Sequence, residues 1–280
     1  MITTLATAWF LPPWLLLIAV FGLGIIIGSF LNVYLYRFHT GKSLNGSSHC
    51  MSCAKSLAWY ELFPLLSYVG LRGRCCGCGC YIPIRYFVVE LTTGLLFILA
   101  ALTAVTIVEF VWLAAVLIVL LLITVYDYYH FIIPDEMTVA LTALTASWVG
   151  YSWWLGLLVP QEILWTVGAA LAGAGFYFTL WAVSGGRWLG FGDVKLAIPL
   201  GLWVGPLGVF SAVVGAFWVG ALISLVILGW HRFERGQKRL QLSSQTLTMK
   251  SAVPFAPFMI MAAALVYFLN FNVLSFFSFV

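Results

Sequence analysis

The sequence predicts an all-α polytopic membrane protein, with about eight transmembrane helices and one small polar domain. Of its 280 residues, 63% are hydrophobic and only 8% are charged, and the mean hydropathy is +1.07. A soluble domain is typically about 45–50% apolar, so this composition indicates a membrane protein. The apolar residues also fall into separate runs, most of them near the roughly 20 residues that a helix needs to cross a bilayer.

Eight apolar runs supply the predicted transmembrane helices. Pro134, followed by Asp135 and Glu136, marks the start of the fourth, because proline fits a first helical turn and acids suit its positive end. The sixth run starts at 193 or 194, ends at Gly205-Pro206 and is short, at about a dozen residues. In chain order the runs are 15–36, 86–108, 110–126, 137–158, 163–183, 193–205, 207–230 and 253–276.

The basic residues predict how these helices are oriented. All thirteen Lys and Arg fall within 37–85, 187–195 and 232–250. Short loops rich in Lys and Arg stay on the cytoplasmic side, so we expect these segments in the cytoplasm and the N-terminus outside. The net charge of +4 therefore reflects orientation in the lipid bilayer and predicts no nucleic-acid partner.

The polar segment 38–85 contains all six cysteines and is predicted to be a small cytoplasmic domain. Cys50 and Cys53 form one C-x-x-C pair and Cys75 and Cys78 a second, with 21 residues between the pairs. This is the spacing of a four-thiolate tetrahedral zinc site, and the cytosol keeps such thiols reduced. A metal would replace the apolar core that so short a segment cannot build, so we predict structural zinc.

Two further cysteines, Cys76 and Cys80, leave the ligand set open, because either knuckle could shift to use one of them. A redox-active pair or free thiols are the alternatives to a metal. The chain is thus predicted to divide into a first transmembrane helix (1–37), a cytoplasmic tetra-cysteine domain (38–85) and a larger transmembrane domain (86–280).

Two aspartates at the cytoplasmic ends of predicted helices form the candidate reaction centre. Asp127 ends the third apolar run, and Asp193 opens the sixth, directly after Gly190-Phe191-Gly192. A carboxylate inside a membrane helix costs on the order of 2.5–3.5 kcal/mol, so it is rarely kept without a use. Two close carboxyls that share one proton supply both a base for water and an acid for a carbonyl. We therefore predict that this pair hydrolyses a peptide bond.

The helix ends predict which aspartate holds the shared proton. Asp193 begins a helix, where the dipole stabilises its anion, and Asp127 lies near a helix C-terminus, where the neutral acid is favoured. We expect Asp193 to be the resting base and Asp127 the resting acid of one coupled pair. Simpler interpretations exist: Asp193 as a helix N-cap, and Asp127 as an interfacial residue among tyrosines. Asp135 is interpreted as a first-turn residue rather than a catalyst.

In combination, these features resemble the type IV prepilin peptidases, a family of bifunctional leader peptidases and N-methyltransferases. The segment 190–196 contains the G-x-G-D element that is shared with presenilin-type intramembrane aspartyl proteases. Phe87 and Leu62 depart from the family pattern, which has proline and a polar residue there. The other similar motifs are 28–33 with 36–37, the two cysteine pairs, 64–68, 71–75, 82–86, 89–90, Asp127 with 133–135 and Thr138, and 254–258.

The resemblance implies a multi-pass enzyme of the bacterial inner membrane that cleaves the short basic leader of a prepilin or pseudopilin at the cytoplasmic face. Asp127 and Asp193 would be its catalytic residues, and 86–280 its aspartyl peptidase domain. The resemblance also implies that the new N-terminal residue is methylated from S-adenosylmethionine. No nucleotide-binding fingerprint locates that cofactor, so its site is not predicted.

The loop before and within the sixth run is the predicted substrate contact. Gly190, Phe191, Gly192 and Lys195 lie there, and the two glycines let an extended substrate backbone approach closely. Glu90, a further carboxylate at the membrane edge, could receive a substrate amine or pair with a nearby arginine, Arg85 or Arg37.

Two functions of other classes remain alternatives. A small transporter could use Asp127 and Asp193 as a proton relay, but it would show paired inverted halves, and the cysteines would have no explanation. A non-catalytic assembly factor for pili or secretion could keep the fold, although the presence of both aspartates argues against it. The sequence indicates no oligomeric state.

Overall fold

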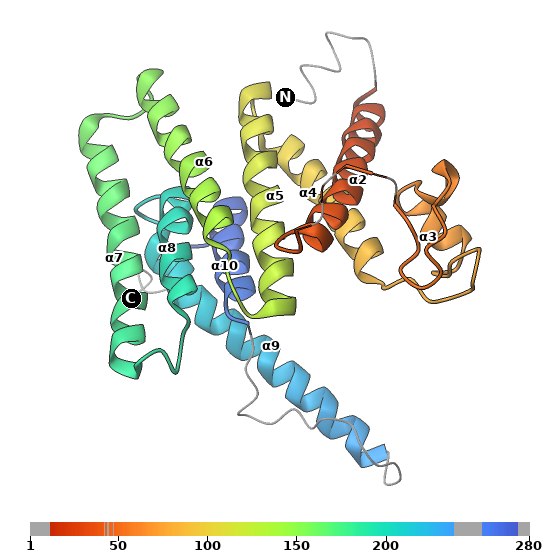
Figure 1. Ribbon diagram of the computed structural model, residues 1–280. Helices are drawn as coiled ribbons and strands as arrows, with labels where there is room; N and C mark the ends of the chain where they lie inside the picture. The colour runs from red at the N-terminus through yellow and green to blue at the C-terminus, as the bar shows by residue number, and fades with distance from the viewer. Residues whose placement is uncertain (1–11, 42, 44, 47, 238–253, 274–280) are drawn as a thin grey trace. The chain divides into compact units, whose positions relative to one another are not determined.

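The computed structural model describes residues 12–41, 43, 45–46, 48–237 and 254–273 (Figure 1). Within these residues the regular elements are helices, apart from two isolated β-bridges in the cysteine-rich segment. The predicted all-α fold class is therefore confirmed. The ends of the eighth predicted run, at 253 and 274–276, and the N-terminal residues 1–11 lie outside the described part of the chain.

A helix occupies each of the eight positions at which the sequence predicts one. The cysteine-rich segment adds a 3₁₀ turn, η1 (Trp59–Glu61), and the short helix α3 (Leu66–Gly70). Among the described residues, the helices at the eight predicted positions are α2 (Pro13–Arg37), α4 (Arg85–Thr103), α5 (Ile107–His130), α6 (Asp135–Trp154), α7 (Pro160–Ser184), α8 (Phe191–Val204), α9 (Val209–Gln237) and α10 (Ala256–Leu269).

Five of these helices are long and apolar enough to cross a bilayer, namely α2, α4, α5, α7 and the first part of α9. The other three helices differ in length or polarity. Helix α10 is apolar but too short, α8 has only 14 residues, and α6 is long enough but more polar. The chain is a multi-pass membrane protein by this measure. That all eight helices cross, and in which direction, stays a prediction.

The chain forms two compact units, Met1–Leu122 and Ile123–Val280. In the first, α2 packs antiparallel against α4 through small residues. A methyl group added at Gly24 would lie 2.8 Å from the Gly94 Cα, and one added at Gly28 would lie 2.8 Å from the Glu90 Cα. Small residues four positions apart let two membrane helices approach this closely, because no side chain separates their backbones.

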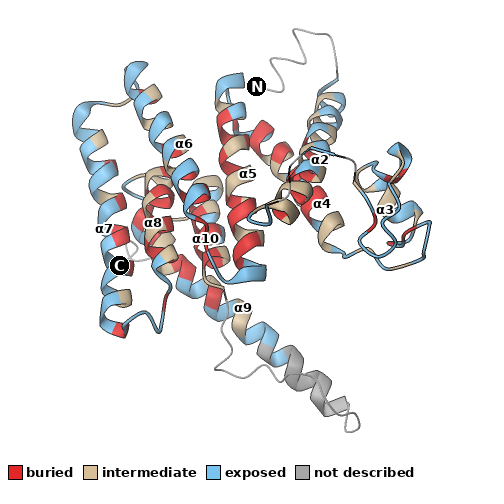
Figure 2. Ribbon diagram, in the orientation of Figure 1, coloured by how far each residue is buried: buried red, intermediate tan, exposed pale blue. Residues whose placement is uncertain are grey.

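In the second unit, the short helix α8 is central and contacts α6, α7, α9 and α10 (Figure 1). Its buried residues occupy most of its length, whereas many residues of α7 are exposed (Figure 2). Exposed residues such as Leu164 and Leu171 suit a lipid-facing surface. The helix that carries Asp193 therefore packs against four other helices of its unit, which fixes the position of its first turn.

Candidate functional site

The second unit brings the two sequence-predicted aspartates to one place. Asp127 lies in the last turn of α5, and Asp193 lies in the first turn of α8. Their residues are only 5% and 7% exposed, and their carboxyl groups interact electrostatically. Two buried carboxyls that interact in this way cannot easily both ionise, so they favour sharing one proton. The arrangement suits acid–base chemistry on a bound water.

Asp193 is oriented by the backbone of its own loop. The N–H of Gly190 donates to its Oδ2 atom at 3.0 Å. Gly190 is the N-cap of α8, so the interpretation of Asp193 as the N-cap itself is wrong by three positions. Since only one carboxylate oxygen makes this bond, Asp193 can fix the loop and still offer its other oxygen to a reaction.

Asp127 is held by the start of α10, a contact that the sequence does not predict. Its carboxyl group contacts the backbone N–H of Ala256, the first residue of α10, and its Oδ2 atom is buried without a hydrogen-bond partner among the described residues. A buried unpaired oxygen suits a proton or a catalytic water. The positive N-terminal end of α10 favours the anion of Asp127, whereas the negative C-terminal end of α5 favours its neutral acid. Which aspartate is protonated at rest stays a prediction.

The predicted substrate residues surround the first turn of α8. Gly192 faces Ile133, in the segment between α5 and α6. Phe191 is 46% exposed, and its ring lies 5.1 Å from that of Trp181.

Lys195 forms an ion pair with Asp135, with 2.5 Å between Nζ and Oδ1. Asp135 is thus the first-turn residue that the sequence predicts, and it neutralises one candidate substrate contact.

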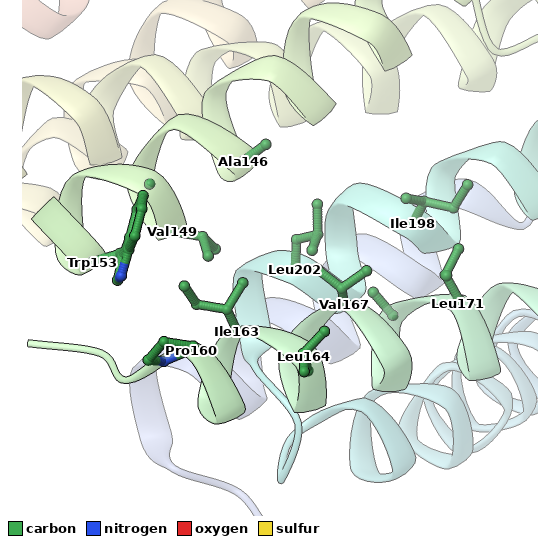
Figure 3. A pocket seen from close by; sticks show the side chains of 12 residues that line it. Ala146, Val149, Trp153, Pro160, Ile163, Leu164, Val167, Leu171, Ile198 and Leu202 are labelled. Atoms are coloured by element: carbon green, nitrogen blue, oxygen red, sulfur yellow. The ribbon is translucent and has the colours of Figure 1, made fainter.

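An apolar groove of the second unit lies on another side of α8. It has a volume of about 580 Å³ and an almost wholly apolar lining (Figure 3). Ile198 and Leu202 contribute to it from positions five and nine residues after Asp193, which lie roughly opposite Asp193 around the helix. The groove therefore offers no group for hydrolysis. Its lining residues are Ala146, Val149, Gly150, Trp153, Pro160, Ile163, Leu164, Val167, Ala170, Leu171, Ile198 and Leu202.

The cysteine-rich segment of the first unit forms two knuckles of the same design. In each, the first cysteine donates its N–H to the carbonyl five residues later, that of Lys55 for Cys50 and that of Cys80 for Cys75. The residue after the turn has a positive φ in both knuckles, 55° at Ala54 and 71° at Gly79. The repeated geometry points the sulfur atoms of both knuckles toward one centre.

The four predicted ligands fit a tetrahedral metal site. The Sγ atoms of Cys50, Cys53, Cys75 and Cys78 all lie within 4.8 Å of one another. Zinc–sulfur bonds of about 2.3 Å would set neighbouring sulfurs roughly 3.8 Å apart. The Sγ atoms of Cys50 and Cys78 are separated by 3.8 Å. Backbone N–H groups of Cys53 and Ser52 lower the pKa of the Cys50 thiol to about 6, which favours the thiolate that binds metal.

The two extra cysteines occupy different surroundings. Cys80 lies beside the metal site, with its Sγ atom 3.5 Å from that of Cys50. Cys76 instead contacts the Glu61 carboxylate and lies 3.0 Å from the Lys55 ammonium. The pKa of Glu61 is lowered to about 2. The largest cause is the hydrogen bond from the N–H of Ala58, and the Cys76 thiol and Lys55 lower it further. Cys76 thus contacts the partly buried Lys55–Glu61 ion pair, while Cys80 is the extra thiol that lies beside a predicted ligand.

Glu90 is buried in the α2–α4 pair. Its Oε2 atom accepts the N–H of Leu65 at 2.8 Å, and the Ser29 hydroxyl also bonds to its carboxylate. One turn earlier on α4, the Asn32 amide of α2 donates to the Tyr86 carbonyl at 3.0 Å. These bonds tie the cysteine-rich segment to the helix pair, so Glu90 has a structural role whether or not it meets a substrate amine.

Two family descriptions match the chain. Residues 22–104 match the bacterial peptidase A24 N-terminal domain, and residues 114–225 match the type IV leader peptidase family. The prepilin leader peptidase/N-methyltransferase of Dickeya chrysanthemi is 30% identical, over 92% of this chain and 94% of its own. The leader peptide-processing enzyme for type 4 prepilin-like proteins of Escherichia coli is 33% identical, over 72% and 82%.

The chain belongs to the type IV leader peptidase family. The resemblance on the sequence motifs is thereby confirmed. A third member, the prepilin leader peptidase/N-methyltransferase of Myxococcus xanthus, is 35% identical over 74% of this chain and 62% of its own length. No solved structure significantly matches the chain. Within this leader peptidase, the family match at 114–225 contains both aspartates, and the match at 22–104 contains both cysteine knuckles.

Proposed function

We propose that this family member is an aspartic endopeptidase that removes the leader of type IV prepilins or pseudopilins, with Asp127 and Asp193 as its catalytic pair. The observation that carries the proposal is the burial and electrostatic interaction of these two carboxyls at the ends of α5 and α8. Its relatives are named for cleavage of prepilin leaders. The basic segments around the site support a cytoplasmic position at the bacterial inner membrane.

The chemistry requires one ionised and one protonated carboxyl. The carboxylate takes a proton from water, whose oxygen attacks the scissile carbonyl carbon, while the carboxylic acid donates a hydrogen bond to the carbonyl oxygen. As the C–N bond breaks, a proton passes to the leaving amine. Burial strengthens both steps, because few solvent dipoles screen the pair. The Oδ2 atom of Asp127, which has no partner among the described residues, is free to carry the proton of the acid or to bind the water.

The loop before α8 would hold the substrate next to this pair. This loop contains Gly190, Phe191 and Gly192. Because the two glycines have no side chains, an extended peptide could approach the loop backbone and form hydrogen bonds with it. Phe191 is half exposed and Lys195 borders the same turn. The apolar helix of a prepilin would lie in the bilayer beside the enzyme, with its polar leader at the cytoplasmic loops.

The cysteine knuckles would hold one structural zinc ion through Cys50, Cys53, Cys75 and Cys78. Four protein sulfurs leave no open coordination position, so the ion would stabilise the segment and take no part in hydrolysis. N-methylation from S-adenosylmethionine is proposed from the family relationship alone. Two cavities of the second unit have mainly apolar linings that do not fit a charged nucleoside, so no step is assigned to that cofactor.

The test is cleavage of a purified prepilin by the purified enzyme in detergent, followed by loss of the leader on a gel. Asp127→Ala and Asp193→Ala should each abolish leader loss, because either change removes half of the proton exchange. Glu162→Gln is the matched control, since this exposed acid only accepts the Val159 N–H at 2.9 Å and the amide oxygen can replace it. Cleavage at the normal rate by either aspartate variant would overturn the proposal.

A further inference from the structure

Tyr177 lies level with Asp193 on the neighbouring helix. Helices α7 and α8 run antiparallel (Figure 1), and a methyl group added at Gly201 would lie 2.6 Å from the Ala170 Cα, so these two residues face each other. Tyr177 follows Ala170 by seven residues on α7, and Val194 precedes Gly201 by seven residues on α8. Both steps span about 10 Å in the same direction, because the helices are antiparallel. The register therefore places Tyr177 beside the first turn of α8.

The side of α7 that carries Tyr177 faces the stripe of α8 that begins at Asp193. A small cavity of about 20 Å³ is lined by Tyr177 and Gly173 of α7 and by Ala197 and Gly201 of α8. Ala197 and Gly201 follow Asp193 by one and two turns, so they share its face. A cavity of this size holds about one water molecule.

The aromatic ring of Tyr177 is fixed by its neighbours. The residue is 2% exposed, stacks on Phe217 at 6.2 Å between ring centroids and meets Phe255 edge-on at 6.1 Å. Phe255 directly precedes Ala256, whose N–H contacts Asp127. Tyr177 thus touches the segment that holds one aspartate while lying level with the other.

The hydroxyl group of Tyr177 interacts electrostatically with Asp193. Buried tyrosine hydroxyls almost always find a partner. Asp127 from α5 and Tyr177 from α7 are the titratable groups that face Asp193 in the described part of the second unit, and Lys195 is paired with Asp135. The Asp193 carboxylate is therefore the charged acceptor that interacts with this phenol in the described part of the second unit.

We propose that Tyr177 is a positioning residue of the aspartate pair, whose phenol donates a hydrogen bond to the Asp193 carboxylate in the active enzyme. This inference rests on the proposed peptidase function. The bond would hold Asp193 in the orientation needed to accept a proton from water, and it would favour the ionised form of that carboxyl over the neutral one. The rigid aromatic packing around the ring would keep the donor in place throughout the reaction.

Tyr177→Phe tests this directly, because it removes the hydroxyl and keeps the ring. Loss of a hydrogen bond to a charged group should lower kcat by about 10- to 100-fold, with KM changed little. The acidic limb of the pH–rate profile should move to higher pH, since the Asp193 anion loses a donor. Tyr267→Phe is the matched control, because Tyr267 stacks on Trp203 at the other end of α8 and should keep the normal rate and profile.

A second substitution separates loss of the hydrogen bond from loss of folding. Replacing Tyr177 with 2,3-difluorotyrosine keeps the hydroxyl and makes it a stronger acid, so the acidic limb should move to lower pH, opposite to the phenylalanine variant. A Tyr177→Phe enzyme with normal kcat, or two variants with an unmoved pH profile, would overturn this inference while leaving the aspartate mechanism standing. If Asp127→Ala and Asp193→Ala also cleaved normally, the proposed function itself would fall.

Discussion

Gly192 lies so close to Ile133 that a methyl group added to the glycine would sit 3.1 Å from the Ile133 Cβ. Ile133 belongs to the connection that follows Asp127, and Gly192 directly precedes Asp193. The contact thus joins the two chain segments that carry the aspartates. Because Ile133 side-chain atoms lie 3.1–3.3 Å from that position, a side chain at Gly192 strains the contact between the two segments that carry the aspartates.

Substitution of Gly192 should impair catalysis far more than folding. Displacing a reacting group by about 1 Å can cost roughly 100-fold in rate, so we expect Gly192→Ala to lower kcat/KM by about 10- to 100-fold and Gly192→Val by more. The measurement is prepilin cleavage together with the thermal unfolding midpoint in detergent. Gly168→Ala, at a helix position with nothing within 4 Å, should change neither quantity. Equal rates for the Gly192 and Gly168 variants would contradict this prediction.

The positions of the helices and of the paired aspartates could be predicted because both depend on local patterns. Apolar runs of helix length predict helices, and the ends of those runs at Asp127 and Asp193 predict a common membrane face. The cysteine spacing likewise predicts which four sulfurs gather. The close approach of α2 and α4 was not predicted from Gly24 and Gly28, although glycines four residues apart are a known signal for it.

The remaining features depend on contacts between distant segments, which one sequence does not reveal. Ala256 holds Asp127 through its backbone N–H, a group that every residue except proline has. Tyr177 is one of twelve tyrosines in the chain, and only the register of α7 against α8 distinguishes it. The pairing of Lys195 with Asp135 also requires the first turns of α6 and α8 to meet. The catalytic, substrate and metal assignments stay predictions until they are measured.

Removal of the metal should unfold the cysteine-rich segment. Cys50→Ser, Cys53→Ser, Cys75→Ser and Cys78→Ser should each reduce bound zinc from one ion per chain to a small fraction, because a tetrahedral site loses a quarter of its ligands. Elemental analysis of the purified protein measures the zinc. Thermal unfolding in detergent, with and without a chelator, measures the loss of stability.

Cys76→Ser is the matched control for these four variants. Its thiol contacts Lys55 and Glu61 rather than the other sulfurs, so this variant should keep one zinc ion per chain. Cys80→Ser should also keep the ion, although the Cys80 sulfur lies 3.5 Å from that of Cys50. Zinc lost from Cys80→Ser and retained in Cys78→Ser would show that the second knuckle uses Cys80 as its ligand.

A bulky side chain at Gly28 should separate α2 from α4. A methyl group there would lie 2.8 Å from the Glu90 Cα and 3.0 Å from the Thr93 hydroxyl oxygen. Overpacking of this kind costs about 1–3 kcal/mol, so Gly28→Val should lower the thermal midpoint by several degrees. Gly22→Val changes the same helix at a position with nothing within 4 Å and should leave the midpoint unchanged. The same midpoint for both variants would show that the two helices do not depend on this contact.

The ion pair between Lys195 and Asp135 allows substrate binding to be separated from stability. The side chains are 36% and 69% exposed, so the pair contributes at most about 1 kcal/mol to folding. Lys195→Ala and Asp135→Ala should therefore lower the thermal midpoint by similar small amounts. If Lys195 also contacts substrate, as its position beside the first turn of α8 predicts, only Lys195→Ala should raise KM for prepilin, by several-fold.

The exchanged variant Lys195→Asp with Asp135→Lys makes this distinction sharper. It keeps both charges in contact, so the double-mutant cycle should recover most of the stability that either single charge reversal loses. The ammonium would then belong to α6 instead of α8, and KM should stay raised. Recovery of KM together with stability would mean that Lys195 acts only by holding α8 to α6, and that the substrate meets Gly190, Phe191 and Gly192 without it.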